Sequence, residues 1–127
     1  MATLDTIANP LAGELGLAYD ADITANVLGA EIDLLDVASV GWFFLCTTFT
    51  SGTLTLQVQV SDTSGSGYAL DPSATYTINA GEVVDGTGVF QIGYSGAKRY
   101  AKLDVVVDTP VGIGGVAIAV KDKNVKS

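Results

Sequence analysis

Strict alternation of apolar and polar side chains in two segments constrains the fold of this chain most strongly. In residues 53–60 every second side chain is leucine or valine, namely Leu54, Leu56, Val58 and Val60. In residues 98–107 one face carries Arg99, Ala101, Leu103, Val105 and Val107, and the opposite face carries Lys98, Tyr100, Lys102 and Asp104. A period of two is that of a β-strand. Each segment is therefore predicted to form a half-buried antiparallel strand.

Residues 40–49 differ because they are apolar on both faces. Val40, Trp42, Phe44 and Cys46 alternate with residues that include Phe43, Leu45 and Phe49. A strand of this kind is either central in a sandwich or covered by a neighbouring subunit. We expect Trp42 and Phe44 to take part in a contact with another subunit.

Further strands are predicted at 22–28, 30–35, 75–79, 88–94 and 112–120, separated by glycine, aspartate and proline turns. Seven or eight short strands at this spacing are typical of an antiparallel β-sandwich or barrel. Residues 10–17 could form a short helix, but their two glycines disfavour it. The expected organisation is an extended N-terminal arm (1–21), one β-sandwich domain (22–120) and a polar C-terminal tail (121–127).

Composition and charge exclude several classes of function. The 127 residues carry a net charge of −8 and contain no histidine. An acidic chain does not favour nonspecific nucleic-acid binding, and the lack of histidine removes histidine-based catalytic sites and imidazole metal ligands. The 48% hydrophobic share leaves an apolar surface, which indicates burial against partners. A single cysteine forms no internal disulfide, and no apolar run is long enough to span a bilayer.

The charges are unevenly distributed along the chain. All six cations follow residue 97, namely Lys98, Arg99, Lys102, Lys121, Lys123 and Lys126. Residues 1–97 contain acidic side chains but no lysine or arginine. One interpretation is internal pairing, in which the cationic strand lies beside an acidic one. The other is a contact with a second chain, since complementary charge sets orientation and association rate. For the second interpretation the candidate contact residues are Lys98, Arg99, Tyr100 and Lys102.

No motif in the sequence predicts a catalytic, cofactor or metal site. Residues 62–67 resemble half of a calcium loop, but Ser73 stands where the bidentate glutamate belongs. The pairs Asp20/Asp22 and Asp33/Asp36 are interpreted as turn residues, and Cys46 as core. Of the tyrosines, Tyr68, Tyr76, Tyr94 and Tyr100 are predicted near strand ends or on polar faces, where they would serve subunit contacts or, alternatively, stack sugars.

Three local patterns occur in a fixed order. They are Gly29-Ala30-Glu31-Ile32-Asp33 followed by an aromatic strand, the segment 51–62, and the segment 92–100 that ends in Lys98-Arg99-Tyr100. This order resembles small structural proteins of tailed bacteriophages, some of which are capsid decoration (cement) proteins. The resemblance covers residues 22–120. It implies a jelly-roll-like β-sandwich and an oligomer, preferably a trimer, that binds the major capsid protein on the capsid exterior. Synthesis in the host cytoplasm is expected because the first twenty residues have neither the basic start nor the continuous apolar stretch of a secretory signal.

The resemblance implies no catalytic residues and no cofactor. We therefore expect a non-enzymatic virion protein that stabilises a capsid, with no nucleic-acid or membrane partner. The alternatives are another virion component, such as a head spike or tail protein, and a carbohydrate-binding β-sandwich module.

Overall fold

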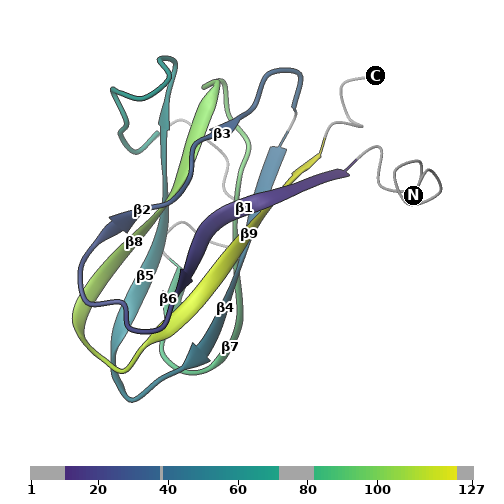
Figure 1. The fold of residues 1–127 in the computed structure, drawn as a ribbon. Coiled ribbons are helices and arrows are strands. Elements are labelled where there is room, and N and C mark those ends of the chain that lie inside the picture. The colour runs from purple at the N-terminus through teal and green to yellow at the C-terminus, as the bar shows by residue number, and fades with distance from the viewer. Residues whose placement is uncertain (1–10, 38, 72–81, 123–127) are drawn as a thin grey trace.

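The computed structural model describes residues 11–37, 39–71 and 82–122. This part of the chain is all-β, and its strands pack as two antiparallel sheets face to face (Figure 1). The strands are β1 (Leu11–Asp20), β2 (Val27–Leu28), β3 (Ile32–Asp33), β4 (Ser39–Thr48), β5 (Ser51–Ser61), β6 (Glu82–Val84), β7 (Gly88–Tyr94), β8 (Tyr100–Val111) and β9 (Gly114–Asp122).

The strand order is that of a jelly roll. Sheet A has the order β1-β9-β4-β7, and sheet B has the order β2-β8-β5-β6, with β3 also paired to β8. Early strands pair with late ones in nested fashion: β1 with β9, β2 and β3 with β8, β4 with β7, and β5 with β6. This arrangement is a double-sheet jelly roll. The predicted antiparallel, jelly-roll-like β-sandwich is confirmed.

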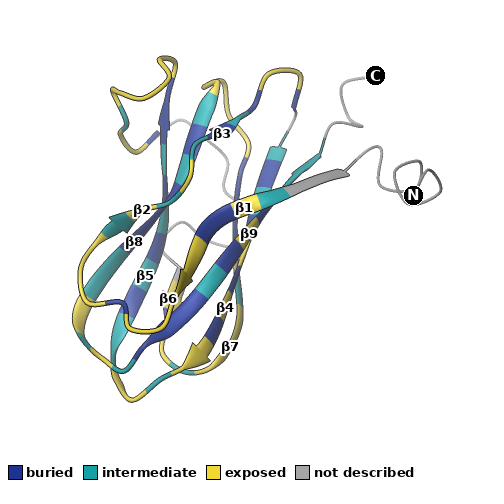
Figure 2. Ribbon diagram, viewed as in Figure 1, coloured by how far each residue is buried: buried dark blue, intermediate teal, exposed yellow. Residues whose placement is uncertain are grey.

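The alternating segments form the centre of sheet B as predicted. Residues 53–60 lie within β5, where Leu54, Leu56, Val58 and Val60 are buried. Ala101, Leu103 and Val105 of β8 face the same core, whereas Arg99 precedes the strand and is exposed. Figure 2 shows the buried residues along the inner strands of both sheets.

The aromatic strand β4 directs its largest side chains into the core. Trp42 and Phe44 are both 0% exposed. On β9 they are opposed by alanines, because Trp42 pairs with Ala119 and Phe44 pairs with Ala117. Because β4 and β9 are neighbours in sheet A, the small alanines leave room beside the two rings on the inner face of that sheet. The predicted role of Trp42 and Phe44 in a subunit or capsid contact is therefore wrong, since neither side chain reaches the surface.

Residues 11–20 form a strand, although the sequence analysis places them in an extended arm. β1 is an edge strand with irregular pairing to β9 on either side of Leu17. At its bulge, the carbonyl oxygen of Gly16 accepts a hydrogen bond from the backbone N–H of Ala30 at 2.8 Å. This bond links the edge of sheet A to the segment between β2 and β3. Residues 1–10 of the predicted arm lie outside the described residues.

The other predicted boundaries are met to different degrees. β7 coincides with the predicted strand 88–94, and β9 lies two residues later than predicted. Of the predicted strands 22–28 and 30–35, only the short pieces β2 and β3 are paired. β6 was not predicted, and the predicted strand 75–79 and residues 123–127 of the predicted tail lie outside the described residues.

The contact between Gly16 and the β2–β3 segment yields a stability prediction. A methyl group at Gly29 would collide with the carbonyl oxygen of Gly16, whereas one at Gly86 would meet nothing within 4 Å. Gly29→Ala should lower the free energy of unfolding by about 1–3 kcal/mol in urea titrations, because the added methyl would push apart two backbones that the Ala30–Gly16 hydrogen bond holds together. Gly86→Ala, the control, should change it by less than about 0.5 kcal/mol. Equal effects of the two substitutions would contradict the packing described.

Candidate functional site

Three cations in or next to the late strands β8 and β9 form ion pairs with acids in or next to the earlier strands β1, β3 and β5. The Nζ of Lys98 lies 3.1 Å from Oδ2 of Asp62. The guanidinium of Arg99 donates two hydrogen bonds to the carboxylate of Asp33, at 3.0 and 3.1 Å, and stacks over the ring of Tyr100 at 5.0 Å. The charge asymmetry of the sequence is thus resolved at these positions by internal pairing.

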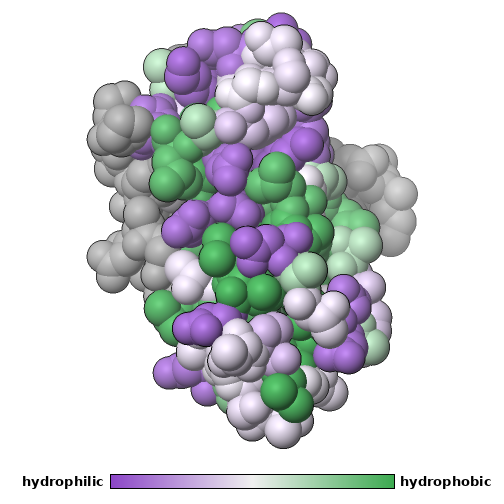
Figure 3. Space-filling model, turned by 90° about the vertical axis from the view of Figure 1, so that its left-hand side faces the viewer, coloured by the Kyte–Doolittle hydropathy of each residue, from purple (hydrophilic) through white to green (hydrophobic). Residues whose placement is uncertain are grey.

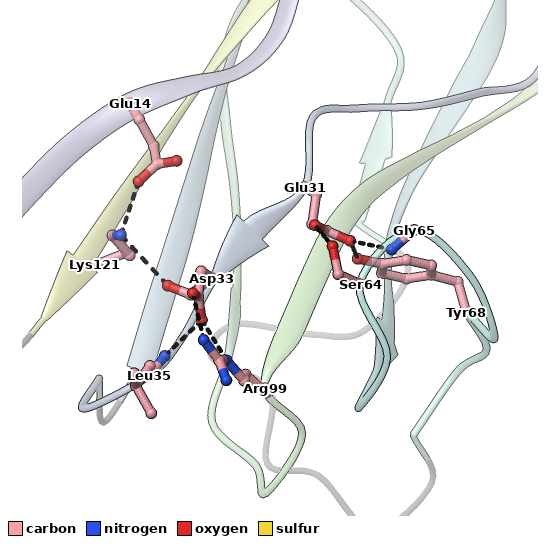
Figure 4. A network of polar contacts seen from close by, with 9 residues as sticks. All are labelled: Glu14, Glu31, Asp33, Leu35, Ser64, Gly65, Tyr68, Arg99 and Lys121. Atoms are coloured by element: carbon pink, nitrogen blue, oxygen red, sulfur yellow. Dashed lines mark hydrogen bonds and ion pairs between the residues drawn. The ribbon is translucent and has the colours of Figure 1, made fainter.

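Asp33 also links β3 to β9 and, through Lys121, to β1. Its carbonyl oxygen accepts a hydrogen bond from Nζ of Lys121 at 3.4 Å, and the same Nζ lies 2.9 Å from Oε2 of Glu14 (Figure 4). The Arg99 guanidinium and the backbone N–H of Leu35 hold the pKa of the Asp33 carboxyl below its usual value. Residues from β1, β3, β9 and the β7–β8 connection are therefore fastened together at one end of the sandwich.

Glu31 holds the loop that follows β5. Its carboxylate accepts hydrogen bonds from the Ser64 hydroxyl at 2.6 Å, the Gly65 backbone N–H at 2.8 Å and the Tyr68 hydroxyl (Figure 4). These bonds, led by the one from Ser64, lower the pKa of Glu31. Burial and the bond to Glu31 raise the pKa of Tyr68, and Nζ of Lys102 lies 4.6 Å above the Tyr68 ring.

The predicted contact residues Lys98, Arg99, Tyr100 and Lys102 are thus each engaged within the chain. The ion pairs are solvent-exposed, with side chains of Lys98 and Arg99 43% and 44% exposed. Pairs of this kind each contribute about 0–1 kcal/mol. The role of these residues in a contact with another chain stays a prediction.

The loop 62–67 connects two antiparallel segments and has the turn chemistry expected of a hairpin. The Ser61 hydroxyl accepts from the Thr63 backbone N–H and donates to the Ser66 carbonyl, and Val60 pairs with Ala69 across the loop. Asp62, the first residue of the calcium-loop resemblance, forms an ion pair with Lys98. Within the described ranges, no group of three or more histidine, cysteine or acidic residues is placed to hold a metal ion.

The other candidate residues also take structural positions. Asp20 and Asp33 accept hydrogen bonds from the backbone N–H two residues later, as turn residues do. Cys46 is buried in the core. Tyr94 ends β7, as predicted for a tyrosine near a strand end, but it is 1% exposed and donates to Asp71 at 3.0 Å, so it does not lie on a polar face. Tyr76 lies outside the described residues.

Hollows occur beside the hairpin loop and on the outer side of sheet A. The first, about 540 Å³, is lined by residues already engaged with one another, including Asp62 and Lys98. The second, about 310 Å³, lies where Gly41 pairs with Gly93, so that side chains are missing from two neighbouring strands. Phe43, Gln91 and Val120 border it.

The outer face of sheet A carries an uncharged surface that the strand register assembles. Ile118 lies between Leu15 of β1 and Phe43 of β4, and Leu45 lies between Val116 of β9 and Val89 of β7. We call these exposed and half-exposed side chains the sheet A patch: Leu15, Phe43, Leu45, Val89, Val116 and Ile118. The sequence contained a signal for it, since residues 40–49 are apolar on both faces, but not which face turns outward.

The outer face of sheet B is polar by comparison. It carries Thr53, Thr55, Gln57 and Gln59 on β5 and Lys102 and Asp104 on β8. Asp104 is nearly buried and accepts a hydrogen bond from Gln59 at 3.0 Å. Figure 3, which looks at the side where β2 and β8 lie, shows hydrophilic residues interspersed with hydrophobic ones. The two sheets therefore present different surfaces to solvent.

Comparison with known proteins finds a similar fold in a solved structure. No family model and no curated protein matches the sequence. Among solved structures, the fold is similar to that in the crystal structure of the SPBc2 prophage-derived protein YomS, with a TM-score of 0.57 and 12% identity. The match covers 87% of this chain and 92% of that one. No helix in the described part of the chain is long and apolar enough to cross a membrane.

The bonds to Glu31 predict how the loop after β5 responds to acid. Because the pKa of Glu31 is lowered, its stabilising bonds are fully present above the ordinary value of 4.5 and are lost as the pH falls through the lower folded value. The Gly65 amide proton resonance, followed by NMR, should therefore titrate with a midpoint below 4.5. Glu31→Gln should remove this titration, and the control Asp36→Asn should leave it in place. A midpoint at or above 4.5 would contradict the network.

Proposed function

We propose that this chain is a structural protein of a tailed-bacteriophage virion that binds the outside of the capsid and stabilises it. The observation that carries the proposal is the sheet A patch. Contiguous exposed apolar surface marks sites of interaction, and this patch lies on a chain whose net charge is −8. The jelly-roll likeness to a prophage-derived protein supports a phage setting, as does the motif resemblance over residues 22–120.

The proposed role is binding rather than catalysis. The partner is the major capsid protein, and the chain acts as a homo-oligomer, preferably a trimer. A protein that binds only the assembled shell stabilises it by mass action, by about 2.7 kcal/mol per site at a free concentration 100 times the dissociation constant. The polar network at the end of the sandwich that carries Asp33 and Arg99 serves this role indirectly, because it fixes the connections between strands while the sheet A patch remains open.

Binding to shells tests the proposal directly. The wild-type chain should co-sediment with empty, expanded shells of the major capsid protein encoded in the same genome, and it should raise the temperature at which those shells open. Sedimentation with isolated tails and not with shells would overturn the decoration role and favour a tail component.

A matched pair of variants tests the patch. Ile118 is 50% exposed at the middle of the patch, and Thr55 occupies an outward position on sheet B opposite Val106. Ile118→Lys should reduce shell binding at least about tenfold, because a buried unpaired charge is costly at an interface. Thr55→Lys should bind as the wild type does. Urea unfolding of both variants should show that the fold is kept. Equal binding by both variants would count against the patch.

A further inference from the structure

We infer that the sheet A patch binds a surface with an apolar strip flanked by lysine or arginine side chains, an inference that rests on the proposed function. The argument concerns the end of the sandwich that carries the β1–β2, β4–β5, β6–β7 and β8–β9 connections, lowest in Figure 1, which we call the hairpin end.

Charge is distributed differently at the two ends. The three ion pairs of the described residues all lie at the end opposite the hairpin end, where Lys98, Arg99 and Lys121 meet Asp62, Asp33 and Glu14. The hairpin end carries exposed carboxylates at Asp20, Asp22, Asp85 and Asp108. No lysine or arginine lies near them among the residues that the structure describes, so this end has a net negative charge.

Two of these carboxylates lie at the hairpin end on opposite sides of the sandwich, Asp20 at the end of β1 and Asp85 in the connection from β6 to β7. Asp20 ends β1, the edge strand on one side, and Asp85 lies three residues before β7, the edge strand on the other. Between them Val116, Leu45 and Val89 are aligned across adjacent strands. Three strand spacings separate the two edges, which is ~14 Å. The arrangement is an uncharged strip whose hairpin end has an acid toward each side.

The charges select among possible occupants. A second copy seated on the same strip with its hairpin end alongside would bring its own carboxylates beside Asp20 and Asp85, and like charges across an interface are unfavourable. A capsid surface with cations at the corresponding spacing would gain attraction at the rim and burial of the strip at the centre. The acids would then set the orientation of docking, with the hairpin end toward the basic part of the shell.

Two double variants with the same change of net charge test the inference on intact shells. Asp20→Asn/Asp85→Asn removes the two acids at the sides of the hairpin end, and Asn at position 20 keeps the oxygen that accepts from the Asp22 backbone N–H. Asp36→Asn/Asp62→Asn removes two acids at the opposite end, and Asn tolerates the positive φ of Asp36. The first variant should bind shells about fivefold more weakly at low salt, as expected for two exposed charge pairs. The second should bind as the wild type does.

Salt and one further position separate the alternatives. The difference between the double variants should disappear near 1 M salt, where the screening length falls to about 3 Å. Val89 lies within the strip. Val89→Lys should bind shells more weakly than Val89→Glu, because the lysine would face the partner's cations with like charge and the glutamate with opposite charge. Equal binding by the two double variants, or stronger binding by Val89→Lys, would overturn the inference while leaving shell binding established. Self-association of the wild type that strengthens with salt and competes with shells would assign the strip to a second copy. Absence of wild-type binding to shells would overturn both proposals.

Discussion

The fit of two aromatic rings against small residues determines which way sheet A faces. Trp42 and Phe44 occupy the core because Ala119 and Ala117 oppose them on β9, and Gly16 approaches the Trp42 ring from β1. Larger residues at these positions would force the sheets apart. Since side chains alternate along a strand, placing these rings inside places Phe43 and Leu45 outside. The packing of the core thus generates the apolar surface on which the proposed function depends.

The parts of the fold that follow from local pattern were predictable. β5, β7 and β8 have alternation or well-marked turns, so their positions could be read from single segments. β1 could not, because its glycines and irregular alternation hide its pairing with β9, a strand about 100 residues away. β6 has only three residues, which is too short to show a period. Pairing with a distant strand determines whether such a segment becomes a strand, and a single sequence does not show that pairing.

The surface chemistry was predictable only in outline. The one-sided distribution of cations was evident, but the pairing of Arg99 with Asp33 joins residues 66 positions apart and depends on the jelly-roll order. The aromatic segment 40–49 was recognised as apolar on both faces, which left its inward face undecided. The alanines at 117 and 119 were the missing signal, because their small size marks the positions that face large rings.

The nested pairing of strands has a consequence for where the chain enters and leaves the sandwich. Leu11 at the start of β1 lies opposite Asp122 at the end of β9, so the chain enters and leaves the sandwich at the same pole (Figure 1). That pole is the one farthest from the hairpin end. Whatever continues from the first strand is therefore attached beside whatever continues from the last, at the pole away from the acidic hairpin end.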